Sequence, residues 1–446
     1  MQRLSLPARH LTRPRPLLLP AVPCRALARA RRHRAPRAQL RPLLAFIAAA
    51  LALHTVAARP TWLVDPTLHV RAGVDTNPVA VGGSASVLGT KDTATFAAGL
   101  SFALAAPTAP DRAAAKLSYA TEVVRFDEWA SENHTSHRLA FSSRSQAGDW
   151  HWSLDDSTLW IDGSRDTLAS LAACNGNGTS LWRERRAQWQ HRAKVFAQHE
   201  AGSTRIRIFG TLLDYDYLTR TEAGRASFAD RSDLLAGVDA GWKRSDHSFW
   251  FVGARAGRQH QDTVPLPGGA FDYSNRYSRL IAGWEGKLTD ATTLAFSAGP
   301  DFRRYDGHID ARVFPRRSHT LPWFDASLTS QLSPTVSLTA KTTRWAWLSS
   351  TGKSAYNDLA AELALAWSVT PKLSLRIATK AHQCSYFPSV RNDWETLNSL
   401  GATYKLSSTL QLTADVLHHH GWNELPSLSD RRFSRTMLSL GASLRL

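Results

Sequence analysis

The segment Ser327–Thr343, SLTSQLSPTVSLTAKTT, alternates apolar and polar residues on both sides of Ser333-Pro334. Before the proline, Leu328, Ser330 and Leu332 fall on one face of the chain, and Ser327, Thr329 and Gln331 fall on the other. Alternation with a period of two predicts a strand with one apolar and one hydrated face. The Ser-Pro pair predicts a tight turn, so the segment is expected to form a β-hairpin.

The same alternation recurs along the chain in further pairs of segments that are joined by turns of Gly, Pro, Asp and Ser. Longer polar segments separate the pairs, and short turns that alternate with long loops are typical of a transmembrane barrel. We expect about eighteen strands. The predicted strands are Leu68–Val74, Asp92–Ala105, Lys116–Arg125, Arg138–Gln146, Trp150–Asp156, Arg186–His199, Arg205–Tyr215, Leu235–Lys243, Phe249–Gln259, Tyr277–Leu288, Thr293–Phe302, Phe324–Leu332, Val336–Thr342, Leu359–Val369, Leu373–Phe387, Trp394–Leu406, Thr409–His418 and Thr436–Leu446.

Three features favour a barrel whose apolar face is outside over a soluble sandwich whose apolar face is its core. Almost every strand alternates, whereas a soluble domain of this size would include fully buried strands. Closure removes the free edges of a long sheet. Aromatic residues cluster near strand ends, as in interfacial girdles, at Trp150, Trp152, Trp242, Trp250, Trp345, Trp347, Trp394 and Tyr404. We therefore predict an all-β, transmembrane, antiparallel up-and-down barrel with short periplasmic turns and long extracellular loops; a β-helix or propeller would need a fixed repeat period.

Residues 1–58 have the pattern of an export leader. Arg37 and Arg41 precede the apolar stretch Leu43–Leu53, and the segment ends in Ala57-Ala58. A basic start, a short apolar core and a small-residue cleavage site predict a secretory signal peptide. The unusually long basic start indicates either a wrongly chosen start codon or a genuine extension. We expect a single barrel domain over 59–446.

The charge of the chain is concentrated in this leader. It holds eleven Arg and no acid, so 43 of the 54 basic residues and all 37 acidic residues lie beyond it. The barrel itself is therefore only mildly basic, and nucleic acid is not an expected partner.

Two short motifs resemble those of bacterial outer-membrane proteins. The C-terminal residues Ser439, Gly441, Leu444 and Leu446 fit the polar-x-Gly-x-x-apolar-x-apolar sorting signal, with Leu in place of the commoner terminal Phe. The segment Arg71–Pro78 resembles the Gly-Tyr-Asp-Ser-Asn opening of barrels of the putative beta-barrel porin-2 type. The resemblance implies export in a Gram-negative cell, insertion by the barrel-assembly machinery and contact with outer-membrane lipid.

Strand parity places a mixed set of charges on the inward face. Such a set is either a wall whose charges pair across strands or the lining of a weakly anion-preferring channel. The predicted lumen-lining residues are Arg144, Arg186, Arg192, Lys194, Arg205, Arg207, Arg255, Arg279, Lys341, Arg376, Lys380, Glu184, Glu285, Asp325 and Glu362.

The long loop Asp162–Leu181 follows the fifth predicted strand. In general porins the loop at that position folds inward and narrows the pore, and by resemblance we suggest the same here. Cys384 has the parity of inward residues, so an inward loop would bring Cys174 within bonding distance and allow a disulfide.

Other candidate sites are weak. His418, His419 and His420 alternate between faces and cannot converge on one ion, and no Cys or carboxylate set completes a zinc site. No nucleophile motif stands out, so we predict no metal, no cofactor and no enzyme.

The pattern therefore predicts an outer-membrane channel for small polar solutes. An outer-membrane component of a polysaccharide or other export system is the alternative, and a membrane-embedded hydrolase is the third option. The oligomeric state is left open.

Overall fold

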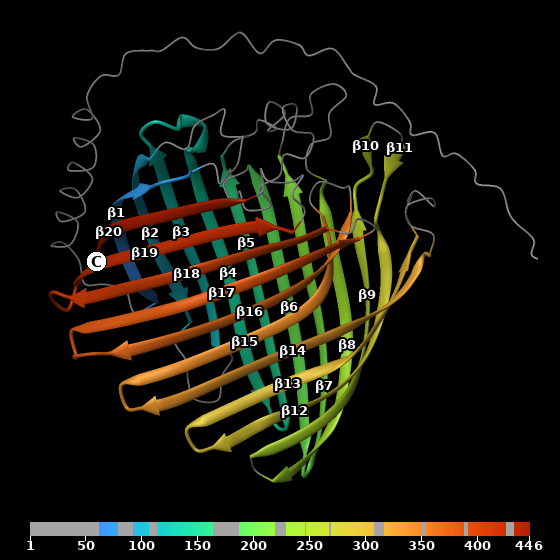
Figure 1. The fold of residues 1–446 in the computed structure, drawn as a ribbon. Coiled ribbons are helices and arrows are strands. Elements are labelled where there is room, and N and C mark those ends of the chain that lie inside the picture. Colours follow the sequence, from blue (N-terminus) through green and yellow to red (C-terminus); the bar gives the residue numbers. More distant parts are fainter. Residues whose placement is uncertain are drawn as a thin grey trace, which may run out of the picture. The chain divides into compact units, whose positions relative to one another are not determined.

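The chain folds into one closed sheet of eighteen antiparallel strands, which confirms the predicted all-β up-and-down barrel (Figure 1). The computed structural model describes residues 62–78, 92–106, 114–163, 187–218, 229–245, 247–266, 269–306, 316–349, 354–387, 391–424 and 432–446. The strands of the barrel are β1 Leu63–Asp75, β2 Thr93–Ala105, β3 Ala114–Phe126, β4 His134–Ala147, β5 Trp150–Asp162, β6 Gln188–Ala201, β7 Thr204–Tyr217, β8 Arg231–Ser245, β9 Ser248–Gln261, β12 Asn275–Thr289, β13 Thr292–Tyr305, β14 Ser318–Ser333, β15 Val336–Leu348, β16 Ala355–Ser368, β17 Leu373–Phe387, β18 Arg391–Lys405, β19 Leu410–Asn423 and β20 Phe433–Arg445.

Two short additions lie in the connections. A separate two-stranded sheet, β10 Val264–Leu266 with β11 Gly269–Phe271, lies between β9 and β12. The 3-10 helix Ala130–Glu132 lies between β3 and β4. Among the described residues, no helix is both long and apolar enough to cross a membrane.

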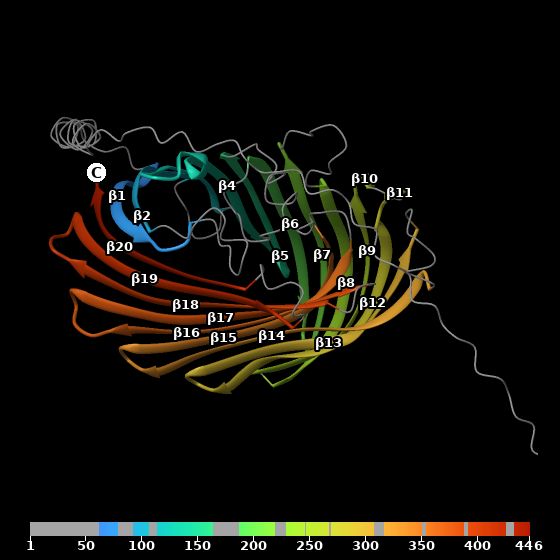
Figure 2. The same ribbon diagram turned by 45° about the horizontal axis from the view of Figure 1, so that its top comes forward.

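The barrel closes where the first and last strands meet. β1 pairs with β2 on one side and with β20 on the other, through nine residue pairs from Thr67 and Arg445 to Asp75 and Met437. Figure 2 shows the blue β1 and the red β20 side by side at this seam. Because the seam pairs the outer edges of both strands, the sheet has no free edge.

The short turns connect neighbouring strands at one end of the barrel. Two of them begin with glycine, Gly148 with φ +60° and Gly202 with φ +57°. Tight hairpin turns require positive φ there, which glycine adopts without a steric penalty. Both turns connect strands that are neighbours in the sequence prediction, Arg138–Gln146 with Trp150–Asp156 and Arg186–His199 with Arg205–Tyr215.

The outward face consists mainly of apolar side chains. Many of its large side chains are exposed, from Trp150 at 36% to Leu440 at 70%. Stacked aromatic rings lie toward both strand ends of this face, as at membrane interfaces. The outward stacked pairs are Trp150–Trp152, Trp284–Phe296, Trp160–Trp189 and Trp394–Trp422. This arrangement, apolar outside and charged inside, is the one expected for strands in a bilayer.

The predicted leader, residues 1–58, lies outside the described residues and stays a prediction, as does the division of the chain at residue 59. From Trp62 onward, all eighteen strands belong to one sheet.

A buried ion pair joins the two strands of the seam on their inward face. Arg435 Nε on β20 donates to Asp75 Oδ1 on β1 at 2.9 Å, and the side chains are only 10% and 1% exposed. The amide of Asn77 donates to the same carboxylate at 3.1 Å. Removal of either side chain would therefore leave the charge of the other buried at the seam.

We expect the Arg435→Met variant to lose about 3–5 kcal/mol of barrel stability, because it leaves the buried Asp75 carboxylate without its cation. Arg445→Met is the matched control, since Arg445 and Asp65 form an exposed pair with 54% and 58% accessible side chains. The control should lose about 0–1 kcal/mol. Urea unfolding of the two variants in detergent micelles measures the difference, and equal losses would contradict this role of the seam pair.

Candidate functional site

The candidate site is the inward wall of the barrel. Strand register places thirteen of the fifteen predicted charged residues on the rows opposite the exposed apolar rows. Arg186 and Glu184 lie outside the described residues. The thirteen fall into two groups, one locked in close ion pairs and one more widely spaced.

The locked group lies on β7, β8, β9 and β12. Arg207 donates to Glu285 Oε2 at 2.8 Å and lies 3.3 Å from Asp239. Arg255 reaches the other oxygen of Asp239 at 2.6 Å, and Arg205 also pairs with Glu285. These side chains are mostly buried, with Arg255 at 9% and Asp239 at 6% exposed. Each of these arginines therefore has a carboxylate partner within the wall.

Aromatic rings hold the same arginines flat against the strands. The guanidinium of Arg207 lies 4.5 Å from the ring centre of Phe251, and that of Arg255 lies 4.0 Å from the ring centre of Phe209. A Cβ at Gly253 would lie 2.0 Å from the Asp239 carboxylate, so only glycine leaves space for this packing. Cation–π contact and ion pairing together fix these arginines in one arrangement.

A second locked set lies on β12 and β13. Arg279 Nε donates to Asp301 Oδ2 at 2.9 Å, and Arg303 donates to the same oxygen at 3.0 Å. Arg303 also donates to Gln259 at 2.8 Å and to Asn275 at 3.1 Å. All five side chains are buried. Arg279 is thus part of the wall structure and is not a free charge in the lumen.

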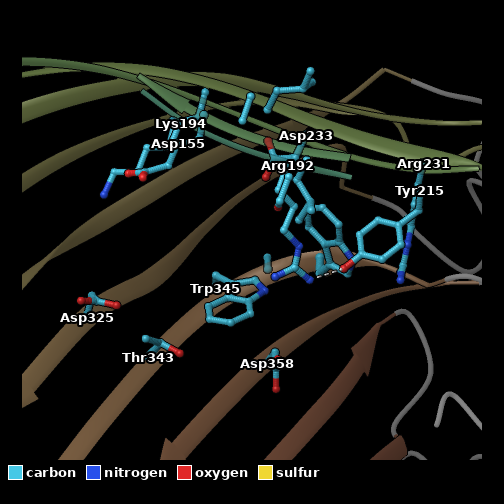
Figure 3. A pocket seen from close by; sticks show the side chains of 18 of the residues that line it. Asp155, Arg192, Lys194, Tyr215, Arg231, Asp233, Asp325, Thr343, Trp345 and Asp358 are labelled. Carbon is cyan, nitrogen blue, oxygen red and sulfur yellow. Dashed lines mark hydrogen bonds between the residues drawn. The ribbon is translucent and has the colours of Figure 1, made fainter. Parts of the chain in front are cut away.

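The spaced group borders a cavity of about 860 Å³ between β5–β8 and β14–β17. Lys194, Arg192 and Lys380 line it together with Asp325. Figure 3 shows Lys194 and Arg192 on one wall facing Asp325 and Trp345 on the other. Arg192 donates to the hydroxyl of Tyr215 at 3.1 Å. Within the described part of the chain, Lys194 and Lys380 have no ion pair shorter than 4.0 Å.

Four further predicted charges lie on the inward face: Lys341, Glu362, Arg376 and Arg144. Lys341 on β15 is the strand partner of Glu362 on β16, without an ion pair below 4.0 Å among the described residues. Glu362 instead lies 3.9 Å from Arg376, with both side chains about half exposed. Arg144 lies 3.4 Å from Asp155, also exposed. Such exposed pairs leave the charges accessible to solutes and screened by water.

The outer end of β15 crosses toward the opposite wall. Pairing between β14 and β15 ends at Arg344, so the following edge of β15 has carbonyl groups without β14 partners. Gln259 on β9 donates to the Ala346 carbonyl at 3.0 Å, and Arg231 on β8 donates to the Leu348 carbonyl. The guanidinium of Arg231 lies 5.3 Å from the ring centre of Trp347. We call these contacts the β15 latch; they narrow the lumen at this end.

The positions of Trp345 and Trp347 differ from the sequence-based expectation. Trp345 and Trp347 were predicted in an interfacial girdle, but both line the central cavity. Trp347 is 7% exposed and packs edge-on against Tyr215 at 6.3 Å. The physical reason is parity, because both tryptophans share the inward face of β15 with Lys341.

A second cavity of about 680 Å³ lies near the seam. Arg71, Glu122 and Arg138 line it. Arg71 donates to Glu122 at 2.8 Å, and His69 lies 3.4 Å from the same carboxylate. Arg71, His69 and Arg138 are not among the lumen residues predicted from the sequence, although their strand parity was available.

Cys384 lies buried on the inward face of β17, where its thiol donates to Asp358 Oδ1 at 3.8 Å, and it forms no disulfide with another described residue. Cys174 lies outside the described residues, as does the loop Asp162–Leu181 from residue 164 onward. The inward fold of that loop and the disulfide stay predictions.

The histidine run alternates between faces. His419 points inward against Glu395 and lies 4.8 Å, edge-on, from the ring of Phe433. His418 and His420 lie on the outward face, where His420 stacks on Trp422. Across the described ranges, no group of three or more His, Cys, Asp or Glu side chains could hold a metal ion.

Comparison with protein-family models and with curated protein sequences gives no match. Several solved structures from Pseudomonas aeruginosa are similar in fold. The outer membrane protein OpdK, solved with vanillate, is 12% identical over 85% of this chain and 98% of its own, with a TM-score of 0.42. OccK9 (OpdG) is 9% identical over 86% and 98%, with a TM-score of 0.44. The siderophore receptor PirA is 10% identical over 87% and 81%, with a TM-score of 0.36. At these identities the likeness concerns the fold alone, and the porin-2 resemblance stays a prediction.

One acidic residue outside the strands gives a pH prediction. Burial, with a smaller contribution from Asp216, Asp262 and Asp214, raises the pKa of Asp230 to about 6, although the Tyr217 amide donates to it at 2.7 Å. The pKa is higher in the folded protein than the ordinary value of about 4, so the folded barrel binds this proton more tightly. The contribution of protonated Asp230 to the free energy of unfolding is fully present below about pH 4 and is lost as the pH rises through 6.

The Asp230→Asn variant should therefore unfold at a higher urea concentration than the parent at pH 7.5 and at the same concentration at pH 4. Unfolding midpoints at both pH values measure this difference. Identical midpoints at pH 7.5 would contradict the raised pKa.

The latch gives a second prediction. The double variant Arg231→Ala/Gln259→Ala should raise single-channel conductance, because both hydrogen bonds that hold β15 across the lumen are removed. Arg276→Ala, on the outward face near the same end, is the control and should leave conductance unchanged. A double variant with parental conductance would show that the latch does not limit passage.

Proposed function

We propose that this chain is an outer-membrane channel for small polar solutes, with a weak preference for anions. The observation that carries this proposal is a charged cavity of about 860 Å³ inside a closed barrel whose outward face is apolar. A soluble protein would bury that apolar face and expose the charges. Charged groups around an interior space provide hydrogen-bonding partners for hydrated solutes that the apolar bilayer excludes.

The division of the inward charges supports the anion preference. Arg205, Arg207, Arg255 and Arg279 are bound to acids in the wall and offer little field to a passing ion. Among the predicted lumen charges that the structure describes, four cations have no close acid partner: Arg192, Lys194, Lys341 and Lys380. Cations in a pore favour anions, and nearby Asp325 and Glu362 keep the preference weak.

The outer-membrane location is part of the proposal. Aromatic stacks toward both strand ends fit the two interfaces of a bilayer. Three of the four sorting residues lie on β20, the seam strand, where Ser439 and Gly441 face inward and Leu444 faces outward, and Leu446 follows the strand directly. We infer that the barrel-assembly machinery receives this strand after the leader is removed. Neither an export role nor a hydrolase gains support from a feature of the described residues.

Planar-bilayer recording tests the function and its charge preference. The parent should give stepwise conductance and a reversal potential on the anion side in a salt gradient. The triple variant Lys194→Ala/Lys341→Ala/Lys380→Ala should move the reversal potential toward cations, because it removes three accessible positive charges.

The matched control is Lys194→Arg/Lys341→Arg/Lys380→Arg, which keeps the charges and should keep the parental reversal potential. Absence of any conductance from correctly folded barrels would overturn the channel. Conductance with a cation preference in the parent would overturn only the anion preference.

A further inference from the structure

A charged cluster interrupts the apolar outward face of the barrel. Asp156 on β5 lies 3.0 Å from His191 on β6, through Oδ2 and Nε2, with side chains 38% and 37% exposed. Asp214 on β7 is the strand partner of His191 and lies on the same face. Register places all three on the row that also carries the exposed Trp152 and Trp189. They therefore point away from the lumen.

The cluster lies at the depth of the hydrocarbon. Along β5, Asp156 is four residues from Trp152 and four residues from Trp160. Trp152 stacks on Trp150 at 5.3 Å, and Trp160 stacks on Trp189 at 5.6 Å. Stacked tryptophans at opposite ends of strands mark the two membrane interfaces. Asp156 is thus midway between them, where water is scarce.

The charges of this cluster do not balance. It has two carboxylates and one imidazole, and Asp214 has no side-chain partner among the described residues. Exposure of such groups to acyl chains is unfavourable, and polar groups at this depth are usually covered by protein. For comparison, the outward pair Thr379 and Asn398 on β17 and β18 is neutral and joined by a hydrogen bond of 2.8 Å.

The surface beside the cluster suits close contact with another sheet. Ala193 is the strand partner of Asp156, and Gly210 and Ala236 are strand partners on β7 and β8. Side chains this small let a second backbone approach closely. The same surface carries both acid and imidazole, so it is complementary to a copy of itself.

We propose that the outward face of β5–β8 around Asp156, His191 and Asp214 is the contact surface of a homodimer within the membrane. In a twofold arrangement each contact occurs twice, so the His191 of one copy faces the Asp214 of the other and both carboxylates gain a partner. The proposal rests on the membrane location proposed above, but not on conduction. A barrel that fails to conduct could still dimerise.

The first experiment measures the mass of the full barrel extracted from the outer membrane into polymer nanodiscs with native lipid. The parent should be a dimer. The variant Asp156→Leu/His191→Leu/Asp214→Leu should dimerise at least tenfold more weakly, because the charges that need a partner are gone. The variant Thr379→Val/Asn398→Leu is the matched control on the opposite wall and should remain dimeric. Heat-modifiable mobility on gels verifies that each variant is folded.

A second experiment locates the contact without disturbing the cluster. In a Cys174→Ser/Cys384→Ser background, Ala193→Cys should form an intermolecular disulfide in oxidised membranes. Ala361→Cys, outward on the opposite wall, should not. A monomeric or trimeric parent, a Leu variant that stays dimeric, or equal cross-linking at both positions would overturn the proposal.

Discussion

The structure depends on the rule that no backbone hydrogen-bonding group can remain unpaired where water is absent. A sheet meets this rule in a bilayer only when its two edges meet, and here β1 pairs with both β2 and β20. The buried pair of Asp75 and Arg435 lies across that junction. Because this junction closes the sheet, the sheet has an outer side, which carries the apolar rows, and an enclosed inner side, which carries the charges.

Closure also explains why the interior is not uniform. One part of the wall, on β7–β13, is stiffened by arginines that lie between carboxylates and aromatic rings, such as Arg207 with Glu285 and Phe251. The wall around Lys194 and Lys380 instead borders open volume. Identical residue types therefore have different roles: the buried arginines support the barrel, and the spaced cations meet the solvent.

Much of this could be predicted from the sequence, because alternation is a local property. The eighteen strands and the inward parity of Lys341 or Arg255 follow from a period of two. The partner of an inward charge could not be predicted, since Glu285 meets Arg205 from 80 residues away. Trp345 and Trp347 were misplaced because proximity to a strand end was weighed above parity. The approach of β15 to β8 and β9 depends on the curvature of the whole sheet, which no local pattern encodes.

The β15 latch has an evolutionary consequence. Gln259 and Arg231 bind main-chain carbonyls of β15 at positions 346 and 348, two residues apart on one edge of the strand. Any side chain at those two positions presents the same carbonyl, so their identity can drift without loss of the contact. Insertion or deletion of one residue in that part of β15 would turn the carbonyls to the other edge. Homologous chains that keep this contact should vary there in composition but not in length.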